Sequence, residues 1–109
     1  MTLPNPEDNK LVVLAKATRA RTGAAQGAAL RDLDGRTYAG ATVDLPSLRI
    51  AALDVCIAMA VASGAKGAEA AVVLGDGAVE LDALRDFAGA DVPVHVGSPS
   101  GQLGDSLAT

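Results

Sequence analysis

The start of the chain carries the pattern of an amphipathic helix. Asn5 followed by Pro6 is a typical helix start, because Asn accepts bonds from free backbone amides and proline fits the first helical position. Apolar residues then recur on one face as far as Arg21, and Gly23 provides a left-handed end. This pattern predicts an N-terminal helix whose inner face is Leu11, Leu14, Ala15 and Thr18.

The next segment predicts a hairpin and a buried helix. Two short runs, 26–32 and 36–43, are separated by Leu33-Asp34-Gly35, and Asp-Gly between such runs favours a tight β-turn. From Leu48 to Ser63 the chain has only two charged residues. We therefore predict a helix there that is buried on several sides, with Ser47 as its N-cap.

The C-terminal third predicts two strands around a short helix. Residues 70–74 form an unbroken apolar run, which suits a parallel or central strand covered on both faces. A turn at 75–77 precedes an amphipathic helix over 79–88, and 92–96 is a second apolar strand. We expect residues 104–109 to be a frayed tail.

The order α-β-β-α-β-α-β predicts an α/β fold, a three-layer α-β-α sandwich with a mixed sheet of four to five strands. With 109 residues the chain has room for one domain over 1–109, with its core at about 6–103. Only 2% of the residues are aromatic, so this core depends on close packing of small aliphatic side chains.

The charge balance excludes some partners. Nine Lys and Arg against 13 Asp and Glu give a net charge of −4, which argues against nucleic acid as a partner. The longest apolar run, 55–62, is far too short to span a membrane, and no secretory signal pattern opens the chain. We therefore expect a cytoplasmic protein without a membrane partner.

Three successive segments carry a spaced set of motifs: Gly27–Leu30, Asp34–Gly40 and Thr42–Asp44. They resemble the small zinc-dependent cytidine deaminases, which typically read V-G-A-A-L and then D-G-x-x-Y-x-G-x-N-I-E-N. The helix that follows, 48–64, resembles the family's L-x-I-C-A-E and A-V-S-E-G. The resemblance covers roughly residues 11–102, and the chain is also similar to short actinobacterial members that lack the zinc motif. It implies the family's three-layer fold.

The resemblance also implies a zinc site, but the side chains differ. Deaminases of this kind need three Cys or His ligands and a Glu that moves protons. The first ligand position falls on Ala51 and the Glu position on Leu53, while the paired cysteines fall at 75–81, where there is none. We therefore expect no zinc and no catalytic residue, and we expect Ala51 and Leu53 to fill the space with apolar contacts.

Three residues are candidates for ligand binding. The family's N-x-E, which holds the ribose hydroxyls, corresponds to Thr42-Val43-Asp44, and Arg49 lies near the vacant metal position. Interpretations without a ligand are also open: Asp44 is typical of a turn, and Arg49 is typical of a solvated or ion-paired surface residue. The family's base-stacking aromatic residue corresponds to Ala24, so stacking by that residue is lost.

Cys56 and His95 are the two other residues with reactive side chains. A single Cys in an apolar helix is typical of a small buried hydrophobe. The only histidine lacks metal-binding neighbours at ligand spacing, so we expect it to face solvent or to bond to the backbone.

Three functions remain open. We favour a non-catalytic protein that binds a partner or assembles with itself. The alternatives are a nucleoside-binding module and a cytidine deaminase-family hydrolase that uses the remnant cleft. Because the middle helix is apolar on nearly every face, and the resembled family forms oligomers through this region, we expect a homo-oligomer, either dimer or tetramer.

Overall fold

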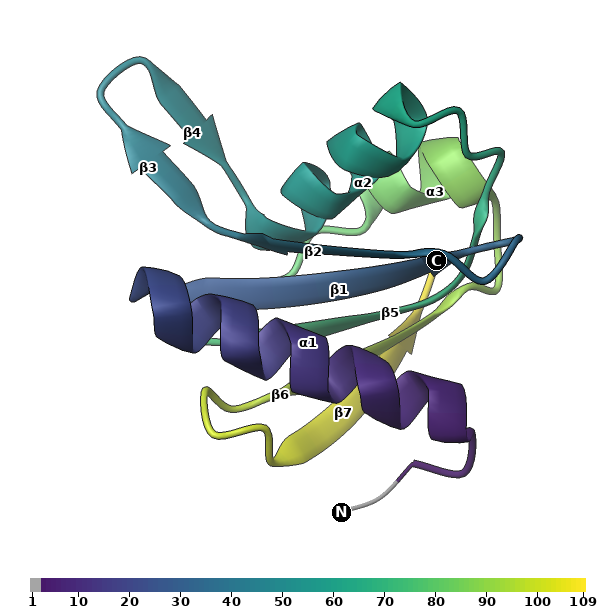
Figure 1. Cartoon of the computed structure of the whole chain (residues 1–109), viewed down its shortest axis with the longest axis horizontal. Helices are drawn as coiled ribbons and strands as arrows, with labels where there is room; N and C mark the ends of the chain where they lie inside the picture. Colours follow the sequence, from purple (N-terminus) through teal and green to yellow (C-terminus); the bar gives the residue numbers. More distant parts are fainter. Residues whose placement is uncertain (1–2) are drawn as a thin grey trace.

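A five-stranded sheet with helices on both faces forms the body of the protein, as the computed structural model of residues 3–109 shows (Figure 1). The elements are α1 (Pro6–Thr22), β1 (Gln26–Asp32), β2 (Thr37–Ala41), β3 (Val43–Leu45), β4 (Leu48–Ile50), α2 (Ala52–Ala62), β5 (Ala68–Gly75), α3 (Asp82–Ala88), β6 (Pro93–Gly97) and β7 (Leu103–Ala108). The strand order is β2-β1-β5-β6-β7, with β5 and β6 parallel and the other neighbours antiparallel. The predicted three-layer α/β sandwich with a mixed sheet is confirmed.

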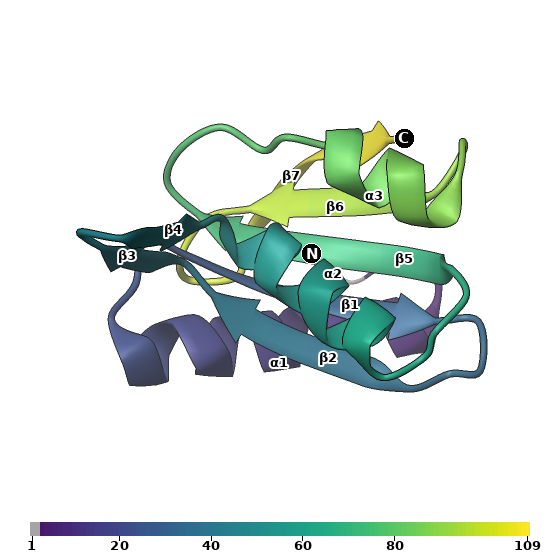
Figure 2. The same ribbon diagram turned by 90° about the horizontal axis from the view of Figure 1, so that it is seen from above.

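Alternate residues of the central strands supply two separate apolar clusters. In β5, Ala71 and Val73 point toward α2 and α3, whereas Val72 and Leu74 point toward α1. Viewed from above, α2 and α3 lie over one face of the sheet and α1 lies beneath the other (Figure 2). Since β5 is covered on both faces, its unbroken apolar run is explained.

The first helix begins and ends where the sequence predicts. The side chain of Asn5 accepts a bond from the amide of Glu7 at 2.9 Å, and Gly23 closes the helix with φ of 68°. The helix lies so close to β1 that a methyl group on Gly27 would collide with the Ala15 carbonyl. A glycine is therefore required at that point of the strand.

The segment before α2 differs from the prediction. A helix was expected from Leu48 with Ser47 as its cap, but 43–50 forms the hairpin β3–β4, and α2 begins only at Ala52 with Ala51 as its N-cap. Proline at position 46 suits a turn, and apolar residues alternate with Asp44 and Arg49 on either side of it. These strands of three residues are too short to stand out from the apolar run that follows.

The C-terminal end also differs, because residues 104–109 are not a frayed tail. Leu103–Ala108 form β7, which pairs with β6 along the edge of the sheet. Thr109 exchanges backbone bonds with Asp91 and Val92, and its hydroxyl donates to the carbonyl of Gly89 at 2.6 Å. These bonds hold the end of the chain against the loop that precedes β6.

The remaining predicted elements are confirmed with small shifts. The expected strand 36–43 is β2 and ends at Ala41, and the expected helix 79–88 is α3 and begins at Asp82. Within residues 3–109, no helix is long and apolar enough to cross a membrane.

Candidate functional site

The start of α2 is where the resemblance places the catalytic residues. Ala51 is the exposed N-cap and offers no side-chain bond to the helix. Leu53, two residues later, is only 3% exposed and belongs to the apolar cluster beneath α2 and α3, against which Val79 and Leu81 also pack. The expected apolar filling is thus correct for Leu53 and wrong for Ala51, because the N-cap residue is exposed while the helix behind it is buried.

Polar side chains beside this helix start are used within the fold. The backbone amide of Gln26 donates to the Thr42 hydroxyl at 3.1 Å, and that hydroxyl donates to the Gln26 carbonyl at 3.3 Å. The side-chain amide of Gln26 donates to the carbonyls of Gly77 and Ala78, both at 3.3 Å. Gln26 and Thr42 therefore join β1 to the loop after β5 and to the chain after β2.

Asp44 and Arg49, the other two candidates, lie opposite each other on the β3–β4 hairpin. Arg49 Nε and Asp44 Oδ1 are 3.3 Å apart, and both side chains are at least three-quarters exposed. The plainer interpretation of Arg49, a surface ion pair, is confirmed. Such an exposed pair contributes little to stability, because water and salt screen it.

The residues of this region do not fit a zinc ion. Alanine and leucine carry no donor atom, and within residues 3–109 no three His, Cys, Asp or Glu side chains are grouped so that they could hold a metal. Cys56 is fully buried in α2, as expected for a small hydrophobe, and burial raises the pKa of its thiol to about 12. It therefore stays protonated at neutral pH.

A hollow of about 380 Å³ lies at the end of the sheet, between the end of β6 and the start of β7. Its walls are residues 96–98 and 102–105, so none of the candidate residues lines it. Ser98 is already engaged there, since its hydroxyl accepts from the amide of Gln102 and bonds to Ser100.

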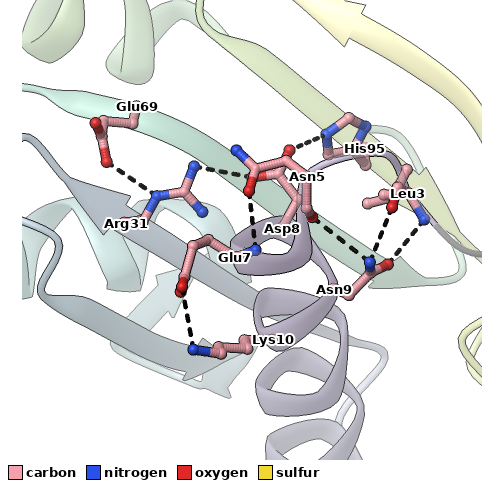
Figure 3. A network of polar contacts seen from close by, with 9 residues as sticks. All are labelled: Leu3, Asn5, Glu7, Asp8, Asn9, Lys10, Arg31, Glu69 and His95. Atoms are coloured by element: carbon pink, nitrogen blue, oxygen red, sulfur yellow. Dashed lines mark hydrogen bonds and ion pairs between the residues drawn. The ribbon is translucent and has the colours of Figure 1, made fainter.

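A buried charge cluster on the α1 face of the sheet was not predicted (Figure 3). Arg31 Nη2 lies 2.9 Å from Asp8 Oδ1, and Arg31 Nε lies 2.9 Å from Glu69 Oε1. His95 Nε2 lies 3.1 Å from Asp8 Oδ2, and its Nδ1 lies 3.1 Å from the Ser106 hydroxyl. Burial alone would lower the pKa of Arg31, but the two carboxylates outweigh it and raise that pKa above its ordinary value. The expectation that His95 faces solvent or the backbone is wrong.

A local signal for part of this cluster exists. Asp8 lies three residues before Leu11 and seven before Ala15, so it shares the inner face of α1. Arg31 follows Ala29 by two residues on β1 and so points to the same side of the sheet. An acid and a base on two buried faces that pack together indicate an ion pair.

Asp32 organises the turn between β1 and β2. Its carboxylate accepts bonds from the amides of Asp34 and Arg36, at 2.9 and 3.0 Å, and from the Tyr38 hydroxyl at 2.9 Å. Burial raises the pKa of Asp32, but these three bonds outweigh it and hold the pKa below the ordinary value of 3.8. Bonds to a charged acceptor are stronger than bonds to a neutral one.

We expect Asp32→Asn to lower the free energy of unfolding at neutral pH and to matter less in acid. Because the folded-state pKa of Asp32 is lowered, its ionised form stabilises the fold above about pH 3.8, and this contribution is lost as pH falls through the lower folded value. Urea unfolding from pH 7 downward measures the difference between variant and wild type. The exposed neighbour Asp34→Asn serves as control, and a difference that grows in acid would contradict the assignment.

The fold and motifs agree with a known family. Residues 4–101 match the family model "Cytidine deaminase-like", so the chain belongs to the cytidine deaminase-like family. None of the curated proteins matches the chain significantly.

The solved structures of similar fold include three bacterial enzymes. Cytidine deaminase from Burkholderia pseudomallei is 24% identical, with a TM-score of 0.73 over 93% of this chain and 90% of that one. Cytidine deaminase from Mycobacterium leprae is 20% identical, with a TM-score of 0.70 over 92% and 93%. The enzyme from Mycobacterium tuberculosis is 20% identical, with a TM-score of 0.67 over 84% and 85%. At these identities the likeness describes the fold.

Proposed function

We propose that this member of the family is not a catalyst and acts by binding, chiefly by assembling with copies of itself. The observation that carries the proposal is the start of α2. The positions that correspond to the family's zinc ligand and proton-transferring Glu hold Ala51 and Leu53, and Leu53 is packed in the apolar core.

The chemistry of deamination explains why these side chains matter. Hydrolytic attack on a cytosine ring needs hydroxide at neutral pH, and a zinc ion supplies it by lowering the pKa of bound water from 15.7 to roughly 7. A general acid and base usually contributes a further factor of about 10²–10⁴ in rate. Ala51 and Leu53 have neither a lone pair for a metal nor a proton to transfer. His95 lies on the α1 face of the sheet, on the opposite side from Leu53.

The contacts of Thr42, Asp44 and Arg49 also argue against a role in ribose binding. The Thr42 hydroxyl is bonded to β1 of its own chain. Asp44 and Arg49 pair with each other on a hairpin that stands away from the sheet, and the stacking position is Ala24. A nucleoside would find no enclosed polar contact from these residues.

An ammonia-release assay with cytidine and deoxycytidine, with and without added zinc, tests the proposal. We expect no ammonia above the uncatalysed background, whereas an active cytidine deaminase assayed in parallel releases it. Melting temperatures measured with millimolar pyrimidine nucleosides cover the binding alternative, and we expect no shift. Zinc-dependent turnover would contradict the proposal, and a saturable nucleoside-induced shift would favour the nucleoside-binding module instead.

A further inference from the structure

Asp8, His95 and Ser106 form a chain of hydrogen bonds that runs from the inner face of α1 to the edge strand β7. His95 Nε2 lies 3.1 Å from Asp8 Oδ2 (Figure 3), and His95 Nδ1 lies 3.1 Å from the Ser106 hydroxyl. The side chains of Asp8 and His95 are about nine-tenths buried, whereas Ser106 is exposed. A carboxylate, an imidazole and a hydroxyl in this order are the groups that activate a serine for attack on an acyl group.

Asp8 determines which ring nitrogen of His95 carries the proton. As the ion-pair partner of Arg31, Asp8 is a carboxylate, which only accepts hydrogen bonds, so Nε2 is the nitrogen that donates to it. Nδ1 then keeps its lone pair, and the Ser106 hydroxyl donates to it. The imidazole is therefore in the tautomer that a general base needs.

The charges around His95 suit the transfer of a proton to it. Asp8, Glu69 and Arg31 lie together on this face of the sheet and carry one net negative charge. An imidazolium formed at His95 would face the Asp8 carboxylate at 3.1 Å, which stabilises the positive charge.

A β-bulge in β7 places Ser106 opposite this imidazole. His95 pairs with Ser106 and Gly97 pairs with Leu103, so three steps along β7 oppose two steps along β6. Without the extra residue, positions 103 and 106 would point to opposite faces of the sheet. Instead Leu103 packs in the cluster on the α1 face and Ser106 bonds to His95 on that same face. Bulges redirect side chains in this way and are frequent beside active sites.

The bulge also lies beside open space. The hollow of about 380 Å³ is walled by Leu103, Gly104 and Asp105, which directly precede Ser106, and by the end of β6. Pockets for small molecules measure about 300–1,000 Å³. The hollow thus has room for a short acyl group next to the Ser106 hydroxyl.

The backbone amide of Ser106 is placed to bind the oxygen of an attacked carbonyl. The amide of Thr109 donates to the carbonyl of Val92 at 3.1 Å, so these two residues are a bonded pair of the ladder. Bonded and non-bonded pairs alternate in an antiparallel ladder, and three positions further along His95 and Ser106 are a non-bonded pair. Because β7 is the last strand of the sheet, the Ser106 amide points off the edge. One such donor suits an ester whose leaving group departs easily.

We infer that Ser106 is an activated nucleophile that accepts an acyl group from a carboxylic ester with a good leaving group. Ser106 Oγ forms a bond to the carbonyl carbon and gives its proton to His95 Nδ1. The bond from that carbon to the leaving oxygen breaks, and the leaving oxygen takes the proton from His95. The product is one acyl-serine per chain, and Asp8 acts as a positioning residue. The site lies on the opposite face of the sheet from Leu53 and is independent of the proposed function.

Reaction with 4-nitrophenyl acetate at neutral pH, followed by mass spectrometry of the digested protein, tests the inference. We expect acetyl on Ser106 to form much faster than on Ser100, an exposed serine that bonds to Ser98 and not to a histidine. Ser106→Ala should remove the fast acetylation, and the control Ser100→Ala should keep it. His95→Gln should slow it by about 10²–10⁴, the contribution typical of a general base. Circular dichroism checks that each variant is folded.

The tautomer of His95 can be measured directly, because it is the only histidine in the chain. At mildly alkaline pH the ring ¹⁵N chemical shifts of wild type should show a protonated Nε2 and an unprotonated Nδ1. Asp8→Asn should mix the two tautomers, because an amide side chain donates as well as accepts. It should also slow the acetylation of Ser106 while the protein stays folded, which a purely structural role of Asp8 would not do.

Three results would overturn the inference, and none of them bears on deamination or self-assembly. If Ser106 and Ser100 are acetylated at the same rate, Ser106 is not activated. If His95→Gln reacts as fast as wild type, His95 is not the base. If Nδ1 carries the proton in wild type, the Ser106 hydroxyl is an acceptor and the chain of bonds is only structural.

Discussion

Leu53→Glu should lower the free energy of unfolding by about 3–5 kcal/mol, the cost typical of an uncompensated buried charge. Leu53 is 3% exposed and surrounded by the apolar cluster of α2, α3 and the sheet, so a carboxylate there has no cation or metal to pair with. Part of the cost can be avoided if the new side chain takes up a proton, which would raise its pKa well above that of an exposed Glu. Under the proposed correspondence, the substitution places the family's residue type at position 53 but in apolar surroundings.

Urea and thermal unfolding at pH 7 measure this effect. Leu53→Met is the control, because a hydrophobic replacement of similar volume usually costs less than about 1.5 kcal/mol. If the Glu variant is as stable as wild type, the start of α2 is open to water, and the apolar filling of the site is incorrect.

Arg31→Met should also be strongly destabilising, by about 3–5 kcal/mol, because it leaves the buried Asp8 carboxylate without its cation. Both side chains of that pair are about nine-tenths buried, and the pair joins α1 to the middle of the sheet. His95 remains as the second partner of Asp8 and limits the loss.

Two further variants separate the charge effect from packing. Glu69→Gln removes the negative charge of the partly exposed partner of Arg31. It should lower the free energy of unfolding by less than about 1 kcal/mol, as is typical of exposed ion pairs. The double variant D8N/R31M should recover part of the stability lost in Arg31→Met, because no unpaired charge remains. Equal stability of Arg31→Met and Glu69→Gln in urea unfolding would show that the Asp8 pair is not the main contribution.

Local signals account for the parts of the fold that the sequence predicted well. Helix α1 is marked at both ends by Asn5 and Gly23, and the turn after β1 by Asp34-Gly35. Asn5 caps the helix, and Gly23 and Gly35 adopt a positive φ, so each of them determines the local backbone geometry by itself. The unbroken apolar run in β5 likewise indicates a strand that is buried on both faces.

The missed elements depend on partners that are distant in sequence or on very short patterns. β7 contains Gly104, Asp105 and Ser106, which have low strand propensity, and it is a strand because β6 offers a free edge. The hairpin β3–β4 has strands of only three residues each, and so short an alternation resembles the apolar start of a helix.

The same distinction applies to the sites. Motif spacing predicts that Ala51 and Leu53 occupy the family's zinc-ligand and Glu positions, and the structure adds that Ala51 is exposed and Leu53 buried. The contact between Asp8 and His95 joins residues 87 positions apart, and no local pattern predicts that pairing. The projection of the β3–β4 hairpin away from the main sheet likewise depends on the three-dimensional path of the chain, so no local pattern predicts it.

Zinc content per chain is the most direct measurement of whether this family member has lost its catalytic centre. Protein produced with zinc in the growth medium and then dialysed should contain far less than one zinc ion per chain, since neither Ala51 nor Leu53 can bind a metal. One tightly held zinc ion per chain would contradict the proposed loss of the site and would mean that other residues of this chain supply the ligands.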